Sequence, residues 1–265
     1  MSGPLSDRVI VVVGGTTGLG LSGAKACVEA GARIVVVGRN PDNVAAAVEA
    51  LGSDADGMVA DAGAPTTADK AIAKAVQQFG NLDGLYHVAG ASGRSFGDGP
   101  LDKITDEGWD ATLRMNLSSM FYSNRAAARQ FLTQGTGGSV LNMGSVIARS
   151  PSPQYFATHA YATTKTAIEG MTTAAAAYYA NRQIRFNVVA PALVETPMAQ
   201  RAARNDEIRQ YISTKQPLDG GRIGAATDLD AAVVYFLSNQ SRFVTGQVLA
   251  VDGGWSVTEG QYPDK

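Results

Sequence analysis

Short apolar runs alternate with helical segments along most of the chain, and this alternation constrains the fold more than any other feature. The first run, RVIVVV at 8–13, is continuous and rich in β-branched residues, which is typical of a strand buried on both faces of a parallel sheet. Similar runs recur at 32–38, 57–61, 82–90, 138–143, 184–190 and 247–254. Segments of helical composition lie between them, at 18–30, from Pro41 onward, and at 70–80, 105–134, 160–181 and 227–237. The sequence therefore predicts a doubly wound α/β fold, with a seven-stranded parallel sheet flanked by helices.

Composition sets limits on domain organisation and on partners. The chain has 265 residues, of which 45% are hydrophobic, and we expect residues 1–265 to form one domain with a large core. A net charge of −2 without a basic stripe predicts no nucleic-acid partner. One cysteine, Cys27, and two histidines predict neither a disulfide nor a metal site. We find no signal-peptide pattern and no membrane-spanning run, so we expect a cytoplasmic protein without a membrane partner.

The segment GGTTGLG at 14–20 joins the first predicted strand to the first predicted helix. Its glycines, Gly14, Gly18 and Gly20, stand at offsets of zero, four and six residues. Glycines in such a turn allow the backbone to approach a pyrophosphate closely, and the start of the following helix offers N–H donors. A glycine-rich turn that binds nothing is the alternative, but its place at the first strand–helix junction favours a dinucleotide site.

The spacing Gly-x-x-x-Gly-x-Gly resembles that of the short-chain dehydrogenase/reductase family, and the resemblance extends over residues 8–254. HVAG at 87–90 is similar to the Asn-Asn-Ala-Gly stretch of that family, PALVETP at 191–197 to its Pro-Gly motif, and GQVLAVDGG at 246–254 to its last strand. The resemblance implies a Rossmann-type fold, a nicotinamide dinucleotide cofactor, and long helices that pair subunits into a homo-oligomer, a tetramer or a dimer. It also implies cofactor-binding positions along the chain, at Gly14, Thr16, Thr17, Gly18, Leu19, Gly20, Asp61, Ala62, Ala89, Gly90, Pro191, Val194 and Thr196.

Several of these positions have particular roles or depart from the family pattern. In the family, the residue at Asp61 ends the third strand and contacts the adenine, and the residue at Thr196 meets the nicotinamide carboxamide. Val13 replaces a threonine before the first glycine, which implies the loss of a small hydrogen bond, and Ala192 replaces the glycine of the Pro-Gly motif. At 87–88, histidine and valine replace two asparagines, which predicts looser support of the sheet edge near the cofactor.

The end of the second predicted strand distinguishes between NAD and NADP. An NAD site of this kind usually ends that strand with an acidic residue, which binds the ribose hydroxyls. Here Gly38 stands at that position and Arg39 follows it. An arginine can pair with the 2′-phosphate of NADP, whereas a carboxylate would repel that group. We therefore expect NADP(H), with a solvated Arg39 and NAD(H) as the alternative.

The segment HAYATTKTAIEG at 159–170 places Tyr161 four residues before Lys165, on one face of a predicted helix. A fixed ammonium near a phenol lowers the pKa of the phenol, so the pair predicts proton transfer near neutral pH. By the family resemblance, Tyr161 is the catalytic acid/base, and both Tyr161 and Lys165 bind the cofactor, Lys165 at the nicotinamide ribose. The resemblance further implies that Ser145 orients the substrate oxygen and that Asn116 holds a water against the lysine. Each residue alone has a structural alternative: a chance spacing, a serine after a strand, or a helix cap.

Together, these patterns predict an NADP(H)-dependent oxidoreductase that transfers a hydride between nicotinamide and a small-molecule carbonyl or secondary alcohol. A 3-oxoacyl thioester, a sugar, a polyol and a steroid-like alcohol remain open as substrates. The alternatives for function are an NAD-dependent alcohol or sugar dehydrogenase, an epimerase or dehydratase, and a non-catalytic nucleotide-binding sensor.

Three segments are expected to line the substrate pocket, at 90–100, 146–156 and 195–224. The last of them is polar and interrupts the alternation of strands and helices, so we expect a mobile lid there. Within the other two, Arg94 and Arg149 could meet an anionic substrate, although we expect both to be solvated. Tyr155 lacks a lysine four residues later, and we expect it to form part of the pocket wall.

Overall fold

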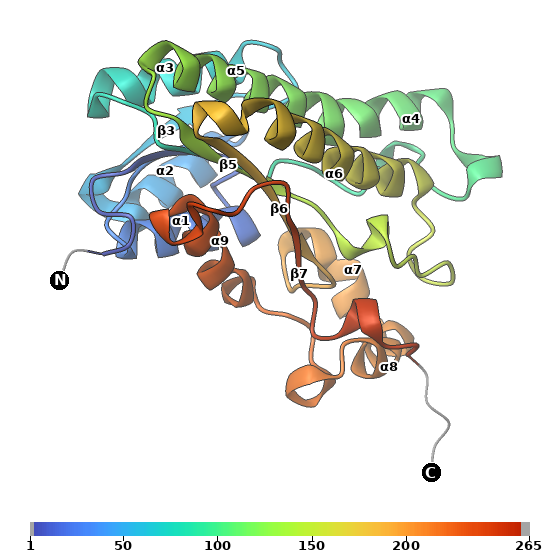
Figure 1. Ribbon diagram of the computed structural model, residues 1–265. Helices are drawn as coiled ribbons and strands as arrows, with labels where there is room; N and C mark the ends of the chain where they lie inside the picture. The colour runs from blue at the N-terminus through green and yellow to red at the C-terminus, as the bar shows by residue number, and fades with distance from the viewer. Residues whose placement is uncertain (1–2, 261–265) are drawn as a thin grey trace.

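The computed structural model describes residues 3–260 and confirms the predicted fold class. Seven parallel strands form one sheet in the order β3-β2-β1-β4-β5-β6-β7 (Figure 1). The strands are β1 (Val9–Val13), β2 (Arg33–Gly38), β3 (Ala55–Val59), β4 (Gly84–His87), β5 (Gly138–Met143), β6 (Ile184–Pro191) and β7 (Val248–Val251). The order reverses between β1 and β4, which places a ligand crevice at the carboxyl ends of these two strands.

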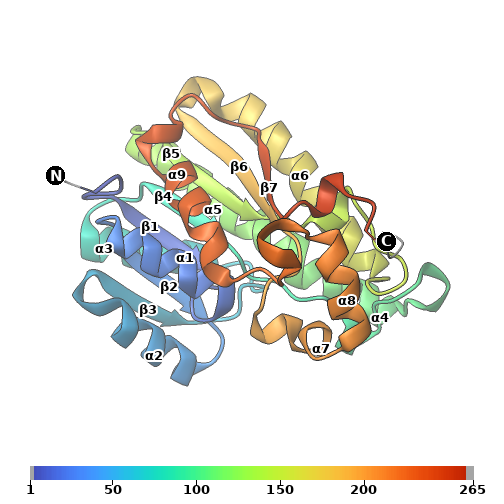
Figure 2. The ribbon, with the colours of Figure 1, turned by 90° about the horizontal axis from the view of Figure 1, so that it is seen from below.

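Helices cover both faces of the sheet. The helices are α1 (Gly18–Glu29), α2 (Pro41–Leu51), α3 (Thr67–Phe79), α4 (Asp106–Leu113), α5 (Ser119–Gln134), α6 (His159–Tyr179), α7 (Gln200–Ala203), α8 (Asp206–Lys215) and α9 (Asp230–Leu237). Figures 1 and 2 show α1, α2 and α9 on one face and α3, α5 and α6 on the other. Among the described helices, none is both long enough and apolar enough to cross a membrane.

Strand β1 shows why the run at 8–13 is continuously apolar. All five of its residues are buried. Ile10 and Val12 belong to the core shared with α1 and α9, whereas Val9, Val11 and Val13 belong to the core shared with α3 and α5. Because successive side chains of a strand point to opposite faces, a central strand covered on both sides needs apolar residues at every position.

Three of the differences between the predicted and the observed element boundaries lie near the site. The predicted helix at 105–134 is divided by a π-helical turn, Arg114–Ser118, into α4 and α5. Strand β4 ends at His87, so the next three residues of the predicted strand follow it as a loop. Strand β3 starts and ends two residues before the predicted strand, and Asp61 therefore lies beyond it. The Asp61 Oδ1 accepts the N–H of Gly63 at 3.0 Å, which turns the chain away from the sheet.

The polar stretch at 195–224 forms α7, α8 and short 3-10 turns at the lower right of Figure 1. It has an apolar cluster of its own, in which Ala202, Ile208 and Ile212 pack with Val146 and Trp255. The helices therefore pack against the carboxyl edge of the sheet. The expected mobility of this stretch remains a prediction.

Candidate active site

A cleft of about 500 Å³ lies at the carboxyl ends of the strands. It follows the point between β1 and β4 where the strand order reverses, the usual ligand position in such sheets. Its walls contain every predicted site residue except Gly20, namely Gly14, Thr16, Thr17, Gly18, Leu19, Arg39, Asp61, Ala62, Ala89, Gly90, Asn116, Ser145, Tyr161, Lys165, Pro191, Val194 and Thr196. The fold therefore brings residues from both halves of the chain into one site.

The glycine turn fits the phosphate groups of a dinucleotide. Gly14 has a φ of +86°, and a Cβ on it would lie 2.6 Å from the backbone nitrogen of Ala89. No side chain caps the start of α1 at Thr17, and the first turn of α1 carries no acidic residue. The first N–H groups of α1 thus need partners from outside the helix, and an anion is favoured there.

Gly20 is the one predicted cofactor-binding residue that does not lie in the wall of the cleft. It is buried within α1 and does not line the cleft. A side chain on it would collide with the carbonyl oxygen of Gly14. Gly20 therefore allows the start of α1 to pack closely against the turn, which is the role of a packing glycine in this motif.

The ends of β2 and β3 form one extremity of the cleft. Gly38 ends β2, and a Cβ there would lie 2.5 Å from the Oγ1 of Thr16. The position that is acidic in many NAD sites therefore cannot hold a side chain while Thr16 keeps its place. Arg39 lines the cleft beside it and is exposed. Within residues 3–260, no ion pair or side-chain hydrogen bond engages the Arg39 guanidinium.

Tyr161 lies in the first turn of α6, and a residue from a distant loop fixes its backbone. The buried carboxylate of Asp98 accepts the N–H of Ala160 through Oδ1 and the N–H of Tyr161 through Oδ2, each at 3.0 Å. The sequence analysis missed Asp98, because no local pattern links this loop residue to a helix more than sixty positions later.

The expected lowering of the Tyr161 pKa by Lys165 is not found. Burial raises the pKa of Tyr161 to about 12, and a hydrogen bond with Ser145 acts in the opposite direction. The Nζ of Lys165 donates to the carbonyl oxygen of Met143 at 2.8 Å and lies 5.3 Å from the centre of the Tyr161 ring. The ammonium is thus bound to the end of β5, and burial lowers its own pKa to about 8. Tyr161 is consequently a protonated phenol at neutral pH, able to donate a proton.

Ser145 and Asn116 approach the same region from two other elements. Ser145 follows β5, and its Oγ accepts the N–H of Ile147 at 3.4 Å. Asn116 is fully buried in the π-helical turn, a local geometry frequent at functional sites. Its side chain donates to the carbonyl oxygen of Ala91 at 2.9 Å and accepts the N–H of the same residue at 3.2 Å. Asn116 therefore holds the loop that follows β4, and its expected water contact remains a prediction.

His87, one of the two departures from the family pattern at the end of β4, contacts α5. It is buried at the end of β4. Its Nδ1 lies 3.0 Å from the Oγ of Ser123, and its Nε2 lies 3.4 Å from the Oγ of Ser119, both on α5. Burial lowers the pKa of His87 to about 3, the charge of Lys165 adds to this effect, and a backbone hydrogen bond at Ala89 opposes it. A neutral imidazole thus ties β4 to α5, and the expected loosening remains a prediction.

All three segments predicted at the substrate end contribute to the cleft, with two corrections. Phe156 lines it, whereas Tyr155 packs outside it against Tyr211, with ring centres 5.0 Å apart. Arg149 lies outside the cleft as well, in an ion pair with Glu169 at 2.6 Å. The lining residues that were not named from the sequence include Arg201, within the predicted stretch, and Trp255, beyond it.

Comparisons with known proteins agree with this geometry. A family model described as "Enoyl-(Acyl carrier protein) reductase" matches residues 13–256. The chain is 32% identical over 258 residues to the L-rhamnose 1-dehydrogenase (NAD(P)(+)) of Sphingomonas sp. (strain SKA58), covering 96% of this chain and 98% of the relative. It is 31% identical over 261 residues to the 2-dehydro-3-deoxy-D-gluconate 5-dehydrogenase of Escherichia coli (strain K12), covering 95% and 96%.

The fold also resembles that of a solved structure. A short-chain type dehydrogenase/reductase from Mycobacterium ulcerans superposes with a TM-score of 0.88 and 31% sequence identity. The match covers 96% of this chain and 92% of that protein. With the glycine turn, Tyr161 and Lys165 in one cleft, the chain belongs to the short-chain dehydrogenase/reductase family of NAD(P)-dependent oxidoreductases.

Proposed function

We propose that the protein interconverts a carbonyl compound and a secondary alcohol, with NADP(H) as the favoured cofactor. The observation that carries this proposal is the convergence of Ser145, Tyr161 and Lys165 in the cleft that also contains the glycine turn. The names of the two relatives, one a rhamnose dehydrogenase and the other a deoxygluconate dehydrogenase, support chemistry at an alcohol carbon.

The side chains have distinct tasks in the proposed reaction. The glycine turn, Arg39 and Lys165 would hold a nicotinamide dinucleotide in the cleft, and this group would supply or accept the hydride. During reduction, negative charge develops on the substrate oxygen, and the hydroxyl of Tyr161 donates its proton there. An alkoxide is a stronger base than a phenolate, even with the Tyr161 pKa at about 12, so this transfer is favourable. Ser145 donates a hydrogen bond to the same oxygen and stabilises the charge that develops there.

The preference for NADP(H) is inferred from the residues at the end of β2. A carboxylate at position 38 would require Thr16 to move, which disfavours the usual recognition of the NAD ribose. The exposed guanidinium of Arg39, which lines the cleft, suits a 2′-phosphate because arginine binds phosphates through charge-assisted, bidentate hydrogen bonds. NAD(H) remains the alternative cofactor.

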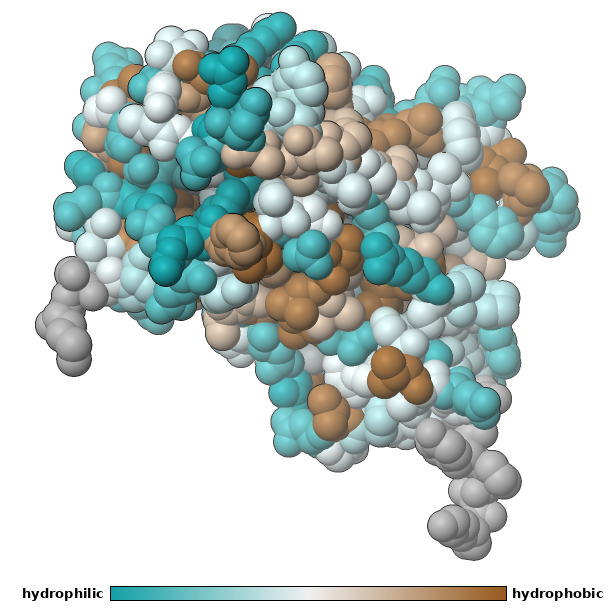
Figure 3. Space-filling view, viewed as in Figure 1, coloured by the Kyte–Doolittle hydropathy of each residue, from teal (hydrophilic) through white to brown (hydrophobic). Residues whose placement is uncertain are grey.

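A homo-oligomer, a dimer or a tetramer, is part of the proposal. Strand β7 ends the sheet, and its Leu249 is 41% exposed. Figure 3 shows hydrophobic side chains gathered at the middle of one face, in the region of β7 in Figure 1. Exposed apolar residues beside an edge strand favour contacts between subunits. Light scattering coupled to gel filtration measures the oligomeric state, and a monomer would contradict this part. The expected cytoplasmic location also stays a prediction.

A panel of carbonyl and alcohol compounds, assayed with both cofactors in parallel, tests the proposed activity. The panel contains 3-oxoacyl thioesters, sugars, polyols and steroid-like alcohols, and turnover is followed by nicotinamide absorbance. We expect at least one class to be turned over, with a higher kcat/KM for NADP(H) than for NAD(H). Cofactor binding without turnover of any class would support a non-catalytic nucleotide sensor instead.

A further inference from the structure

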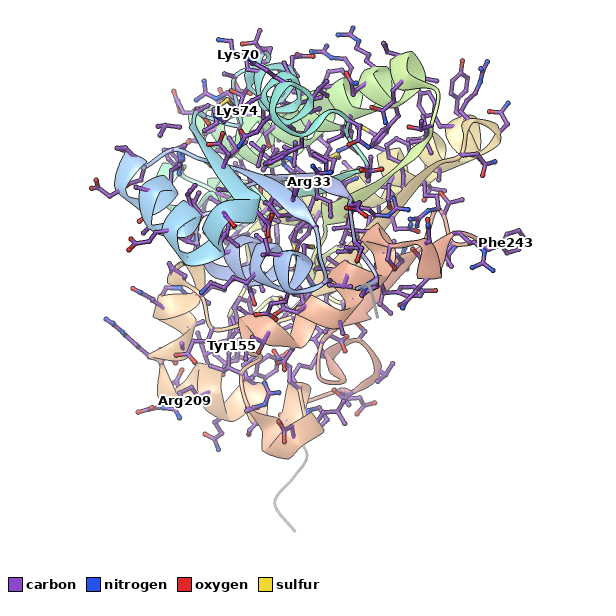
Figure 4. The ribbon with its side chains drawn as sticks, turned by 90° about the vertical axis from the view of Figure 1, so that its left-hand side faces the viewer. Arg33, Lys70, Lys74, Tyr155, Arg209 and Phe243 are labelled. Atoms are coloured by element: carbon purple, nitrogen blue, oxygen red, sulfur yellow. The ribbon has the colours of Figure 1, made fainter. Side chains whose placement is uncertain are left out.

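Two arginines from separate elements converge on one oxygen atom at the substrate end of the cleft. The Nη2 of Arg94 donates to the backbone carbonyl of Tyr155 at 3.2 Å, and the Nη2 of Arg201 donates to the same oxygen at 3.3 Å. Arg94 begins the 3-10 turn Arg94–Phe96, and Arg201 lies in α7. In Figure 4, Tyr155 lies among the side chains near α7 and α8. Both arginines line the cleft and both are exposed, so they lie where the cleft opens to solvent.

The two positive charges lack a matching negative charge. Within the described part of the chain, neither guanidinium forms an ion pair with a carboxylate, whereas Arg149 is paired with Glu169. Burial lowers the pKa of Arg94, the charge of Arg201 adds to this effect, and Asp98 opposes it. Asp98 is itself held at the start of α6 by two backbone N–H groups. The two guanidinium groups therefore share one carbonyl oxygen as hydrogen-bond acceptor, with Asp98 as a negative charge that makes no ion pair with them, and a full anion would stabilise them more.

The floor beside the arginines is apolar. Val146, Phe156, Leu193 and Trp255 line it, and the rings of Phe156 and Trp255 lie with centres 5.8 Å apart. Trp255 is only 3% exposed, and its Nε1 already donates to the carbonyl oxygen of Ser150 at 3.0 Å. This floor suits the hydrocarbon part of a ligand, whereas the guanidinium groups at the opening suit an oxyanion.

We propose that Arg94 and Arg201 form an anion-binding subsite, and that the substrate is a secondary alcohol or ketone carrying an oxyanion at some distance from the reacting carbon. The inference rests on the proposed oxidoreductase function and goes beyond the expectation that Arg94 is solvated. A carboxylate, sulfonate or phosphate meets two guanidinium groups through charge-assisted, bidentate hydrogen bonds. The bound oxyanion would replace the hydrogen bonds of the two arginines to the Tyr155 carbonyl with stronger ones.

Matched acids and amides test the subsite. Hydroxy acids of graded chain length, each paired with its primary amide, are compared as substrates of the wild type and of Arg94→Gln and Arg201→Gln. We expect the best acid to exceed its amide in kcat/KM by about 10- to 100-fold, the range of a hydrogen bond to a charged group. Each variant should raise KM for the acid by a similar factor, with little change in kcat or in the KM of the amide. Lysine at either position should restore part of the affinity, and sulfonate and phosphate analogues identify the preferred oxyanion.

Arg209→Gln is the matched control. Arg209 lies in the neighbouring helix α8, is exposed, does not line the cleft and projects from the surface in Figure 4. The substitution Arg209→Gln removes one positive charge from the same region without touching the subsite. An equal rise in KM for Arg209→Gln would show that general charge, and not the subsite, attracts the acid, and would overturn the proposal.

A binding measurement separates this inference from the proposed function. Calorimetric titration of the acids and amides into the cofactor-loaded protein needs no turnover. Tighter binding of the acid, lost in Arg94→Gln and Arg201→Gln, supports the subsite even if no substrate is turned over; in that case only the proposed function fails. Equal binding of acid and amide, or no binding of either, overturns the subsite. The subsite is also overturned if both variants bind the cofactor more weakly while they bind the acid as the wild type does, because the arginines would then belong to the cofactor site.

Discussion

The carboxylate of Asp98 and the backbone N–H of Tyr161 are joined by a hydrogen bond of 3.0 Å. A second bond of the same length links Asp98 to Ala160. The first N–H groups of a helix have no partner within it, and the helix dipole favours a negative charge at that end. Asp98 therefore caps α6 from outside the helix and fixes the position of the proposed acid. It also connects α6 to the loop that carries Arg94.

Asp98→Asn should impair both stability and turnover. The amide can replace one acceptor but has no charge, so one backbone N–H at the start of α6 loses its partner. We expect a loss of about 1–3 kcal/mol in the free energy of unfolding and a fall in kcat that exceeds the change in KM. Urea unfolding and steady-state kinetics measure the two effects. Asp102→Asn is the control, since Asp102 is exposed in the nearby 3-10 turn Leu101–Lys103; equal effects in both variants would contradict the capping role.

Lys165 should make stability depend on pH in the alkaline range. Its pKa is about 8 in the native protein and about 10.5 in an unfolded chain. Between these values the unfolded chain holds more protons, so the free energy of unfolding rises with pH, by up to about 3 kcal/mol. Lys165→Met lacks this group, and its unfolding free energy should rise less over the same window. Parallel pH dependences of the two proteins in urea unfolding would show that the ammonium is not destabilised in the fold.

The sheet and most of the cleft could be predicted because their signals are local. A strand buried on both faces must be apolar at every position, and β1 is. The glycine turn follows it directly, and Tyr161 and Lys165 share one turn of a helix. These patterns depend on neighbours in the sequence, and the parallel connections then bring them to the same edge of the sheet.

The features that escaped prediction depend on contacts between distant segments. Asp98, Arg201 and Trp255 reach the site from loops and helices whose sequences carry no local signal. The predicted direction of the Tyr161 pKa shift is wrong, because the spacing places Lys165 on the same helical face but does not reveal that Tyr161 is buried. Nor does spacing show that the carbonyl oxygen of Met143 binds the ammonium.

His87 should make the protein less stable in mild acid. Its pKa is about 3 in the fold, against an ordinary value of 6.5. Between these values the unfolded chain binds a proton that the native protein does not, so the free energy of unfolding falls as the pH is lowered, by about 1.4 kcal/mol per pH unit. His87→Asn removes this titration and should flatten the dependence between pH 6.5 and 5. An unchanged slope in His87→Asn would show that His87 is not the titrating group.

Arg39→Asp should change the cofactor preference. The new carboxylate repels a 2′-phosphate and can accept hydrogen bonds from ribose hydroxyls. We expect the Kd of NADPH to rise by at least about tenfold, corresponding to the loss of a charge-assisted hydrogen bond, while the Kd of NADH changes far less. Titration of each cofactor against protein fluorescence gives both constants. Arg33→Asp, at the start of β2 and outside the cleft, is the charge control. If the ratio of the two constants stays the same in Arg39→Asp, Arg39 does not recognise the 2′-phosphate.

Tyr161→Phe should abolish most turnover and spare the cofactor site. The ring and its packing remain, but the hydroxyl that donates the proton is lost, which removes about 10²- to 10⁴-fold in kcat. The glycine turn and Lys165 are untouched, so the Kd of NADPH should stay within about twofold, a small change on the scale of binding energies. Tyr155→Phe is a closely matched control, because Tyr155 lies six residues earlier and outside the cleft, with its hydroxyl bound by Gln154 at 3.1 Å. Its turnover should equal that of the wild type. Full turnover in Tyr161→Phe would assign the proton transfer to another group, and equal losses in both variants would point to a structural effect of the missing hydroxyl.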